Sequence, residues 1–294
     1  MFYRRKIVLA LLQIFGKELD KMHLLKLLFV FTQKQTTKAY DFIPYQYGCF
    51  SYSVYADINA LVQKNILNET DNNITLNVQT DYYNQLKQED KFYLQQIKSQ
   101  FSTMSNDDLI KYTYVNYPYW ATKSTIAKKV LSIAEYEKIL QVTPKSDKII
   151  LFTIGYEGIS LEEYLNRLIK NDVKALVDVR RNPLSMKYGF SKSQLQRYCE
   201  SLGIEYLHFP EVGIETEQRQ ELNSQADYDN LFTMYRENNL SKTITIQNQI
   251  FEILKQKKRI ALTCFEANIN QCHRKHLAEA ISNISQFHYE LTHI

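Results

Sequence analysis

A short stretch near the C-terminal end holds several residues that could do chemistry. They are Cys264, Glu266, Cys272, His273 and Arg274. Carboxylates act as general acids, bases or nucleophiles, so Glu266 is the residue most expected to act on a substrate. The segment from Cys272 opens a helical pattern, and a helix N-terminus attracts anions and lowers thiol pKa values. This predicts anion binding near Arg274 and a lowered pKa for the Cys272 thiol.

Asp178 and Arg180 form a second candidate pair, at the end of the apolar run 175–177. Residues two apart share one face of an extended chain, so the two side chains are expected to meet. One interpretation is an internal ion pair that shapes the following loop. The other makes Asp178 an acid or base, or the partner that orients a phosphate-binding Arg180. The position at the end of a predicted strand favours a role in a site.

Polar residues also follow the other predicted strands, and ligands of open parallel sheets bind at the carboxyl ends of the strands. We therefore expect these residues to share one site. The candidate catalytic residues are Asp178, Glu266, Cys264 and Tyr156. The candidate substrate-binding residues are Arg180, Arg181, Ser185, Lys187, His208, Cys272, His273 and Arg274. No residue is assigned as a metal ligand, and no cofactor is expected.

Three chemistries are open for this set. A metal site would draw on Cys264, Cys272, His273 and His276, but the C-x7-C-H spacing is not a standard zinc pattern. Thiol chemistry is a second option, because Asp-Val-Arg at a strand end with a later Cys resembles sulfurtransferase sheets; the phosphatase-type C-x5-R loop is absent. The preferred interpretation is a pocket for a nucleotide or a nucleic-acid backbone, with arginines on phosphate and carboxylates acting on the sugar or base.

Strand-like and helix-like segments that would position these residues alternate from residue 148 onward. Apolar strand patterns occupy residues 148–154, 173–179, 204–209, 259–264 and 286–291. Helical patterns occupy residues 160–169, 191–201, 218–256 and 272–282. The alternation predicts an α/β domain over residues 148–294, with a mostly parallel sheet of about five strands and helices on both faces.

Residues 1–145 have a different pattern. Helical periodicity covers residues 2–15, 19–33, 51–64 and 82–100, and a hairpin signal spans residues 66–76. Three helices followed by a hairpin predict a mainly α-helical, winged-helix domain. Its candidate recognition helix, 51–64, is not basic. DNA contact and a role in binding a protein partner or forming a homodimer are therefore both open.

Composition is that of an ordinary globular chain. Of 294 residues, 45% are hydrophobic and 23% charged, and the net charge of +4 permits nucleic-acid binding without demanding it. Four cysteines are too few for a disulfide framework in a chain of this length. No apolar run has the roughly 18 residues of a membrane span. The basic and then apolar N-terminus is interrupted by Gln13 and lacks a cleavage site, so we expect a helix there and a cytoplasmic location.

Five motifs in the C-terminal half resemble the family called domain of unknown function 488. They occupy residues 155–158, 178–185, 189–192, 204–213 and the pair 264–266 with 272–274. The resemblance runs over roughly residues 149–284, with Val212-Gly213 standing where the family usually has Leu-Gly. It implies an α/β fold with a polar site built from Tyr156, Asp178, Arg180, Pro183, Ser185, Cys264, Glu266, Cys272, His273 and Arg274. The first domain resembles the winged-helix segment that precedes this domain in some bacterial members.

The resemblance does not supply a reaction, so function rests on the residues. The leading hypothesis is a nucleic-acid-associated protein whose α/β domain binds and processes a nucleotide or nucleic-acid substrate, in DNA repair or phage defence. One alternative is a non-catalytic DNA-binding regulator or nucleotide sensor. Another is a thiol- or metal-dependent enzyme. A membrane partner is not expected.

Overall fold

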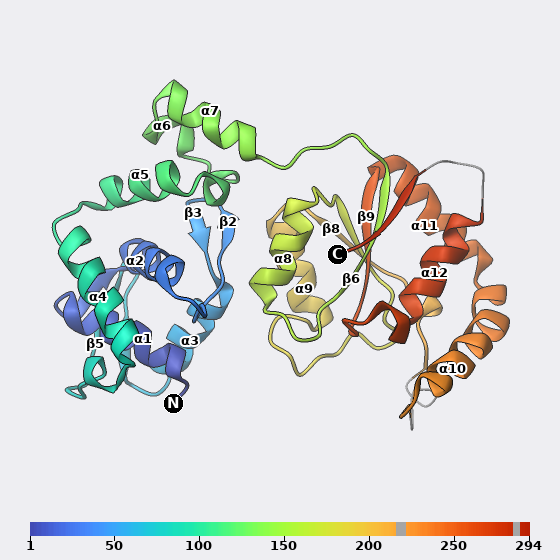
Figure 1. Cartoon of the computed structure of the whole chain (residues 1–294), viewed down its shortest axis with the longest axis horizontal. Helices are drawn as coiled ribbons and strands as arrows, with labels where there is room; N and C mark the ends of the chain where they lie inside the picture. Colours follow the sequence, from blue (N-terminus) through green and yellow to red (C-terminus); the bar gives the residue numbers. More distant parts are fainter. Residues whose placement is uncertain (216–221, 285–288) are drawn as a thin grey trace. The chain divides into compact units, whose positions relative to one another are not determined.

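The computed structural model describes residues 1–215, 222–284 and 289–294 (Figure 1). The chain forms two compact units, Met1–Thr143 and Pro144–Ile294. Each unit has its own buried core, with one core in the first helices and another beneath the C-terminal sheet. Among the described residues, no helix combines the length and apolarity needed to cross a bilayer.

The C-terminal unit is built on a five-stranded parallel sheet. Its strands are β6 (Ile150–Gly155), β7 (Ala175–Asp178), β8 (Glu205–His208), β9 (Arg259–Cys264) and β10 (Glu290–His293), in the order β10-β6-β9-β7-β8. Every residue of β6, β7 and β9 is buried, because helices cover both faces. The predicted α/β class with a parallel sheet of about five strands is confirmed. Of the predicted last strand, residues 286–288 lie outside the described residues.

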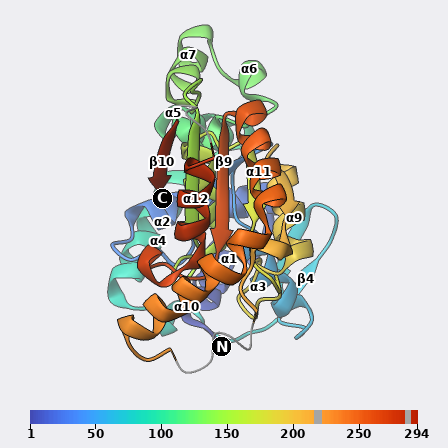
Figure 2. The same ribbon diagram turned by 90° about the vertical axis from the view of Figure 1, so that its right-hand side faces the viewer.

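Helices lie on both faces of this sheet (Figure 1). The helices of one face are α8 (Leu161–Lys170) and α9 (Lys192–Ser201), and those of the other are α10 (Gln225–Asn238), α11 (Ile244–Lys257) and α12 (His273–Ser282). Figure 2 shows the second group in front of the strands. The predicted helical segment 218–256 is two helices separated by a 3-10 turn at Leu240–Lys242, and residues 218–221 lie outside the described residues. Further 3-10 turns lie at Pro210–Val212 and Ile269–Gln271.

The N-terminal unit begins with the predicted three helices and hairpin. These are α1 (Tyr3–Ile14), α2 (Lys21–Lys34), α3 (Tyr52–Val62), β4 (Leu67–Glu69) and β5 (Asn73–Leu76). Strand β1 (Glu18–Asp20) joins the hairpin to give the antiparallel order β1-β5-β4, and a second hairpin, β2 (Ile43–Tyr45) with β3 (Gly48–Phe50), comes between α2 and α3. The winged-helix assignment itself stays a prediction.

The rest of the N-terminal unit is helical. It contains α4 (Gln88–Phe101), α5 (Asn106–Asn116), α6 (Ala127–Val130) and α7 (Ile133–Val142), with 3-10 turns at Tyr83–Gln85 and Pro118–Ala121. The helix predicted over residues 82–100 therefore starts later than its periodicity indicates. Lys87 adopts an extended conformation with φ −61° and ψ 151°, which separates the short turn from α4.

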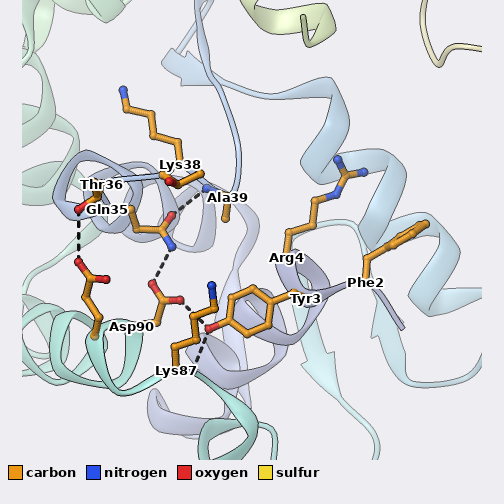
Figure 3. A pocket seen from close by; sticks show the side chains of 11 residues that line it. Phe2, Tyr3, Arg4, Gln35, Thr36, Lys38, Ala39, Lys87 and Asp90 are labelled. Carbon is orange, nitrogen blue, oxygen red and sulfur yellow. Dashed lines mark hydrogen bonds between the residues drawn. The ribbon is translucent and has the colours of Figure 1, made fainter. Parts of the chain in front are cut away.

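A surface pocket of about 470 Å³ lies between the start of α1, the segment after α2 and the start of α4 (Figure 3). One of its lining groups is the buried Asp90 carboxylate, which accepts hydrogen bonds from the Tyr3 hydroxyl (2.6 Å) and the Gln35 amide (2.7 Å). These bonds join one wall of the pocket to another. We therefore interpret the Asp90 carboxylate as a group that stabilises the unit and not as a ligand-binding group.

Asp57 on α3 ties the first helix to the third. Its buried carboxylate accepts hydrogen bonds from Arg4 (2.6 Å), Arg5 (2.7 Å) and the Tyr40 hydroxyl (2.9 Å). Burial alone would raise the pKa of Asp57, but the hydrogen bonds and charges of Arg4 and Arg5 outweigh it and hold the pKa below its usual value. The residue in the middle of the candidate recognition helix is thus turned into the unit and not toward a ligand.

Replacing Asp57 with Asn should lower the free energy of unfolding at neutral pH by about 2 kcal/mol, because the two arginines lose their buried counter-charge. A carboxyl whose folded pKa is depressed contributes stability above its unfolded pKa of about 3.9, and that stability is lost as pH falls through the folded pKa. Urea unfolding at pH 7 and pH 3 should therefore show a smaller pH effect in Asp57→Asn than in the parent chain. The matched change Asp71→Asn, at an exposed turn residue, should alter neither value.

Candidate functional site

The carboxyl ends of four parallel strands bring most of the predicted site residues to one edge of the sheet. Gly155 of β6 lies opposite Cys264 of β9, and Asp178 of β7 lies between Thr263 of β9 and His208 of β8. The predicted residues nevertheless divide into two groups with different surroundings. One group surrounds Asp178, and the other surrounds Cys264.

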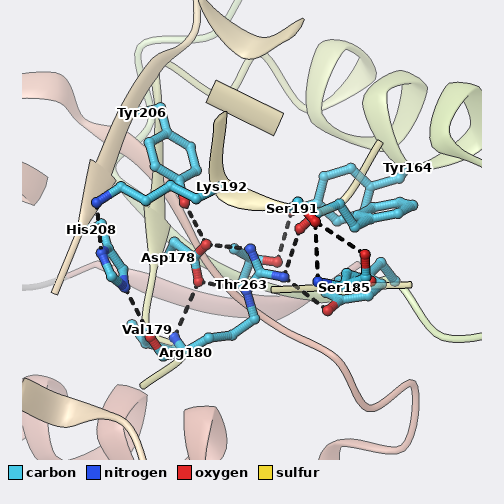
Figure 4. Close-up of polar contacts among 12 residues, drawn as sticks. Tyr164, Asp178, Val179, Arg180, Ser185, Ser191, Lys192, Tyr206, His208 and Thr263 are labelled. Atoms are coloured by element: carbon cyan, nitrogen blue, oxygen red, sulfur yellow. Dashed lines mark hydrogen bonds and ion pairs between the residues drawn. The ribbon is translucent and has the colours of Figure 1, made fainter. Parts of the chain in front are cut away.

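Asp178 and Arg180 form a buried, two-point ion pair. The Arg180 Nε and Nη2 atoms donate to the two Asp178 carboxylate oxygens at 2.8 and 2.5 Å, and the Arg180 backbone N–H donates at 3.1 Å. The Tyr206 hydroxyl, from β8, adds a fourth hydrogen bond at 2.5 Å, which is visible in Figure 4. Asp178 is completely buried, and burial together with its charge raises the pKa of Tyr206.

The remaining donor of Arg180 holds the loop that follows β7. Its Nη1 atom donates to the Tyr156 hydroxyl and to the Phe190 carbonyl oxygen, both at 2.8 Å. The rings of Tyr156 and Phe190 stack with centroids 4.2 Å apart. On the other side, the ring of His208 lies between the Arg180 carbonyl oxygen (2.9 Å) and the Lys192 ammonium (3.0 Å). Arg180 is 5% exposed, so its charge points inward.

This geometry revises the expected roles of Asp178, Arg180 and Tyr156. A carboxylate with four internal donors has no lone pair directed at a substrate, and an arginine with every contact inside the protein does not face a phosphate. The internal ion pair that shapes the loop is therefore the interpretation that the contacts favour. Such a network positions a neighbouring site rather than forming one.

Three further predicted site residues lie on the same loop, which follows β7. Lys187 donates from its ammonium to the Tyr156 carbonyl oxygen at 2.5 Å, and burial lowers its pKa. Ser185 accepts from the Lys187 backbone N–H at 3.1 Å. Arg181 is exposed and pairs with Glu215 at 2.7 Å. None of the three lines the pocket described below.

The second group is a compact cluster at the end of β9. The Cys264 thiol donates to a Glu266 carboxylate oxygen at 3.1 Å, and its sulfur lies 3.7 Å from Nδ1 of His273. The ligand atoms of Cys264, Cys272 and His273 all lie within 4.8 Å of one another, and all three residues are buried. Glu266 is partly exposed. The end of β9, the loop that follows it and the start of α12 therefore meet in this cluster.

The pKa predicted for Cys272 is wrong in direction. Burial raises the pKa of its thiol well above the usual value, and the neighbouring Cys264 and Glu266 raise it further, while Arg274 lowers it. Cys272 does occupy the N-cap position of α12. The loss of hydration in a fully buried position outweighs the favourable field of the helix.

Hydrogen bonds from neighbouring segments hold the backbone of the loop between Cys264 and Cys272. Arg274 is 2% exposed and donates to the carbonyl oxygen of Glu266 at 2.6 Å, so it holds the backbone of this loop, while its buried Nε atom has no hydrogen-bond partner among the described residues. The backbone N–H groups of Tyr156 and Glu157 both donate to the Phe265 carbonyl oxygen. Gly155 permits this approach, because a Cβ there would stand 2.0 Å from the Glu266 carbonyl oxygen. A glycine in the first motif thus sets the position of the acid in the last.

A pocket of about 260 Å³ opens beside this cluster, here called the β9-edge pocket. It is lined by Ile214, Leu222, Tyr228, Leu231, Phe232, Glu266, Gln271 and His273. Glu266 and His273 belong to the predicted set, whereas the apolar wall from the start of α10 does not. The spacing of Tyr228, Leu231 and Phe232 in the sequence is that of one helix face, which indicated burial but gave no sign of a pocket.

Fold and site together describe a parallel α/β domain with a polar cluster at the carboxyl edge of its sheet. Residues 160–281 match the family model described as "Domain of unknown function DUF488". The match confirms the resemblance over most of the C-terminal unit. No curated protein and no solved structure matches the chain.

Replacing Asp178 with Asn should lower the free energy of unfolding by about 3 kcal/mol, because Arg180 would remain buried without its counter-charge. Chemical denaturation followed by fluorescence measures the change. Asp147→Asn is the matched control in the same unit, since its carboxylate is exposed and its ion pair with Lys258 is long, at 3.8 Å. An Asp178→Asn protein as stable as the parent would contradict the positioning role.

Proposed function

We propose that the C-terminal unit is an enzyme whose active site is the β9-edge pocket, with Glu266 as its general acid or base. The observation that carries this proposal is that a carboxylate and an imidazole line the pocket together with several large apolar side chains. Pockets that bind small molecules share this pattern of apolar walls with a few convergent polar groups. Carboxyl groups in such surroundings are suited to proton transfer.

The proposed substrate is a nucleotide or nucleic acid, of which a base or sugar enters the pocket. A volume of about 260 Å³ is below the roughly 300–1,000 Å³ of pockets that enclose whole ligands, so a small group fits better than a complete nucleotide. The Gln271 amide offers both a donor and an acceptor to the edge of a base. Arg180 and Arg274 donate to protein groups, so the proposal assigns them no phosphate.

The N-terminal unit enters the proposal as the module that locates nucleic acid or a protein partner. Its support is the order of three helices and a hairpin that winged-helix modules use. A role in DNA repair or phage defence would follow from such a pairing of modules. The non-catalytic alternative, a DNA-binding regulator or nucleotide sensor, uses the same pocket for binding and leaves Glu266 without a chemical task.

Replacing Glu266 with Gln should lower turnover by about 100-fold or more while the protein stays folded, because the amide keeps the shape but cannot transfer a proton. The assay is a panel of nucleosides, nucleotides and single-stranded oligonucleotides incubated with the full chain, with products separated by chromatography. The control Glu252→Gln, at an exposed residue of α11, should turn over like the parent.

The same panel distinguishes the two classes of function. Turnover that persists in Glu266→Gln would refute the acid–base role. Saturable binding of a nucleotide by the parent chain without any turnover would refute the enzyme and support the sensor.

A further inference from the structure

We infer that Cys264, Cys272 and His273 bind a metal ion of the zinc type at the inner end of the β9-edge pocket. Two sulfur atoms and one imidazole nitrogen within 4.8 Å of one another are the donors that zinc prefers. The inference deepens the proposed function, since it names what would sit beside Glu266, but the metal site itself is tested without any substrate.

The distances fit a tetrahedral ion. With bond lengths near 2.3 Å for sulfur and 2.0–2.1 Å for nitrogen, two ligands of one zinc ion lie about 3.6 Å apart when one is sulfur and the other nitrogen. Cys264 Sγ and His273 Nδ1 are 3.7 Å apart. Small side-chain rotations would bring the Cys272 sulfur to a similar distance, because its present separation is below 4.8 Å.

The hydrogen bonds of His273 direct the correct nitrogen to this point. Its Nε2 atom lies 3.1 Å from the carbonyl oxygen of Val179. A carbonyl oxygen accepts and never donates, so Nε2 carries the proton and Nδ1 presents its lone pair toward Cys264. Histidines that bind metals are typically held in this way, with the other ring nitrogen donating to a carbonyl or carboxylate.

Charge also favours an ion. Two thiols that bind as thiolates, each giving its proton to solvent, neutralise a divalent cation inside a fully buried cluster. The positive charge of Arg274 favours the thiolate form of Cys272, because it lowers the pKa of that thiol. A divalent ion and two thiolates sum to zero charge, which avoids the cost of an uncompensated buried charge.

Glu266 completes the arrangement from the pocket side. Its carboxylate contacts the Cys264 sulfur at 3.1 Å and lines the β9-edge pocket together with His273, whereas Cys264 and Cys272 are buried behind the lining residues. Catalytic zinc sites keep three protein ligands and an open fourth position, and zinc supplies there a water of lowered pKa. Zinc deaminases that act on nucleobases use two Cys, one His and a separate Glu in this division of roles, although their sequence spacing differs from the one here.

The test is the zinc content of the full chain, purified under reducing conditions, dialysed against zinc and then against metal-free buffer. Inductively coupled plasma mass spectrometry should find about one zinc per chain, and a chelator competition should show a roughly 100-fold or greater loss of affinity in Cys272→Ser and Cys264→Ser. Cys199→Ser is the matched control, because Cys199 is an equally buried cysteine of the same unit that lies outside the cluster. Added cobalt should give thiolate-to-metal absorption in the parent and in Cys199→Ser.

Several outcomes would overturn the metal site. Equal zinc in the parent and in Cys272→Ser would indicate an adventitious ion only. A protein that binds no zinc, or one whose Cys264 and Cys272 form a disulfide under the same reducing conditions, would also refute it. If the serine variants unfold, the cobalt spectrum of the parent still tests the metal site: thiolate-to-metal absorption supports it, and the absence of that absorption refutes it.

Glu266→Gln separates this inference from the proposed function. The carboxylate lies outside the three ligands, so that variant should keep its zinc. Retained zinc with retained turnover in this variant refutes the acid–base role and leaves the metal site standing. If the variant loses turnover and the parent chain binds no zinc, the metal site is refuted and the acid–base role stands.

Discussion

The ion pair between Asp178 and Arg180 is the constraint on which the carboxyl edge of the sheet depends. A fully buried carboxylate is tolerated when it is paired and hydrogen-bonded, and here Arg180 and Tyr206 satisfy both of its oxygens. Arg180 binds Asp178 through Nε and Nη2, and its Nη1 atom donates to the Tyr156 hydroxyl and the Phe190 carbonyl oxygen. These contacts join the segment after β6, the loop after β7 and strand β8.

Side chains near the end of β9 line a pocket: Glu266, which follows the strand, and His273, at the start of α12. The loop after Cys264 lies on Gly155 and is held by Arg274, so Glu266 is carried on a fixed backbone while its carboxylate is partly exposed. His273 is held through the Val179 carbonyl, at the end of β7. The two groups of polar residues therefore divide the work between positioning and the proposed chemistry.

The sequence predicted the sheet well because strands covered on both faces are continuous apolar runs, as in 259–264. The spacing of Asp178 and Arg180 predicted their contact, but not that Tyr206 would complete it from another strand. One local rule failed at Cys272: the helix N-terminus predicted a lowered pKa, which burial reverses. The C-x7-C-H spacing gave no sign that the possible ligand atoms of Cys264, Cys272 and His273 lie within 4.8 Å of one another. Spacing rules describe ligands on one short loop, whereas here a strand end and a helix start converge through tertiary packing. Local sequence patterns likewise did not predict that residues of α10 line the pocket.

The most direct test of the β9 edge as the chemical centre is anomalous X-ray diffraction from crystals of the reduced, zinc-loaded chain, recorded above and below the zinc absorption edge. The account predicts one strong peak within bonding distance of Cys264 Sγ, Cys272 Sγ and His273 Nδ1, with the Glu266 carboxylate beside the Cys264 sulfur. A map without that peak, or one with zinc bound elsewhere while the two thiols stand unligated, would contradict it.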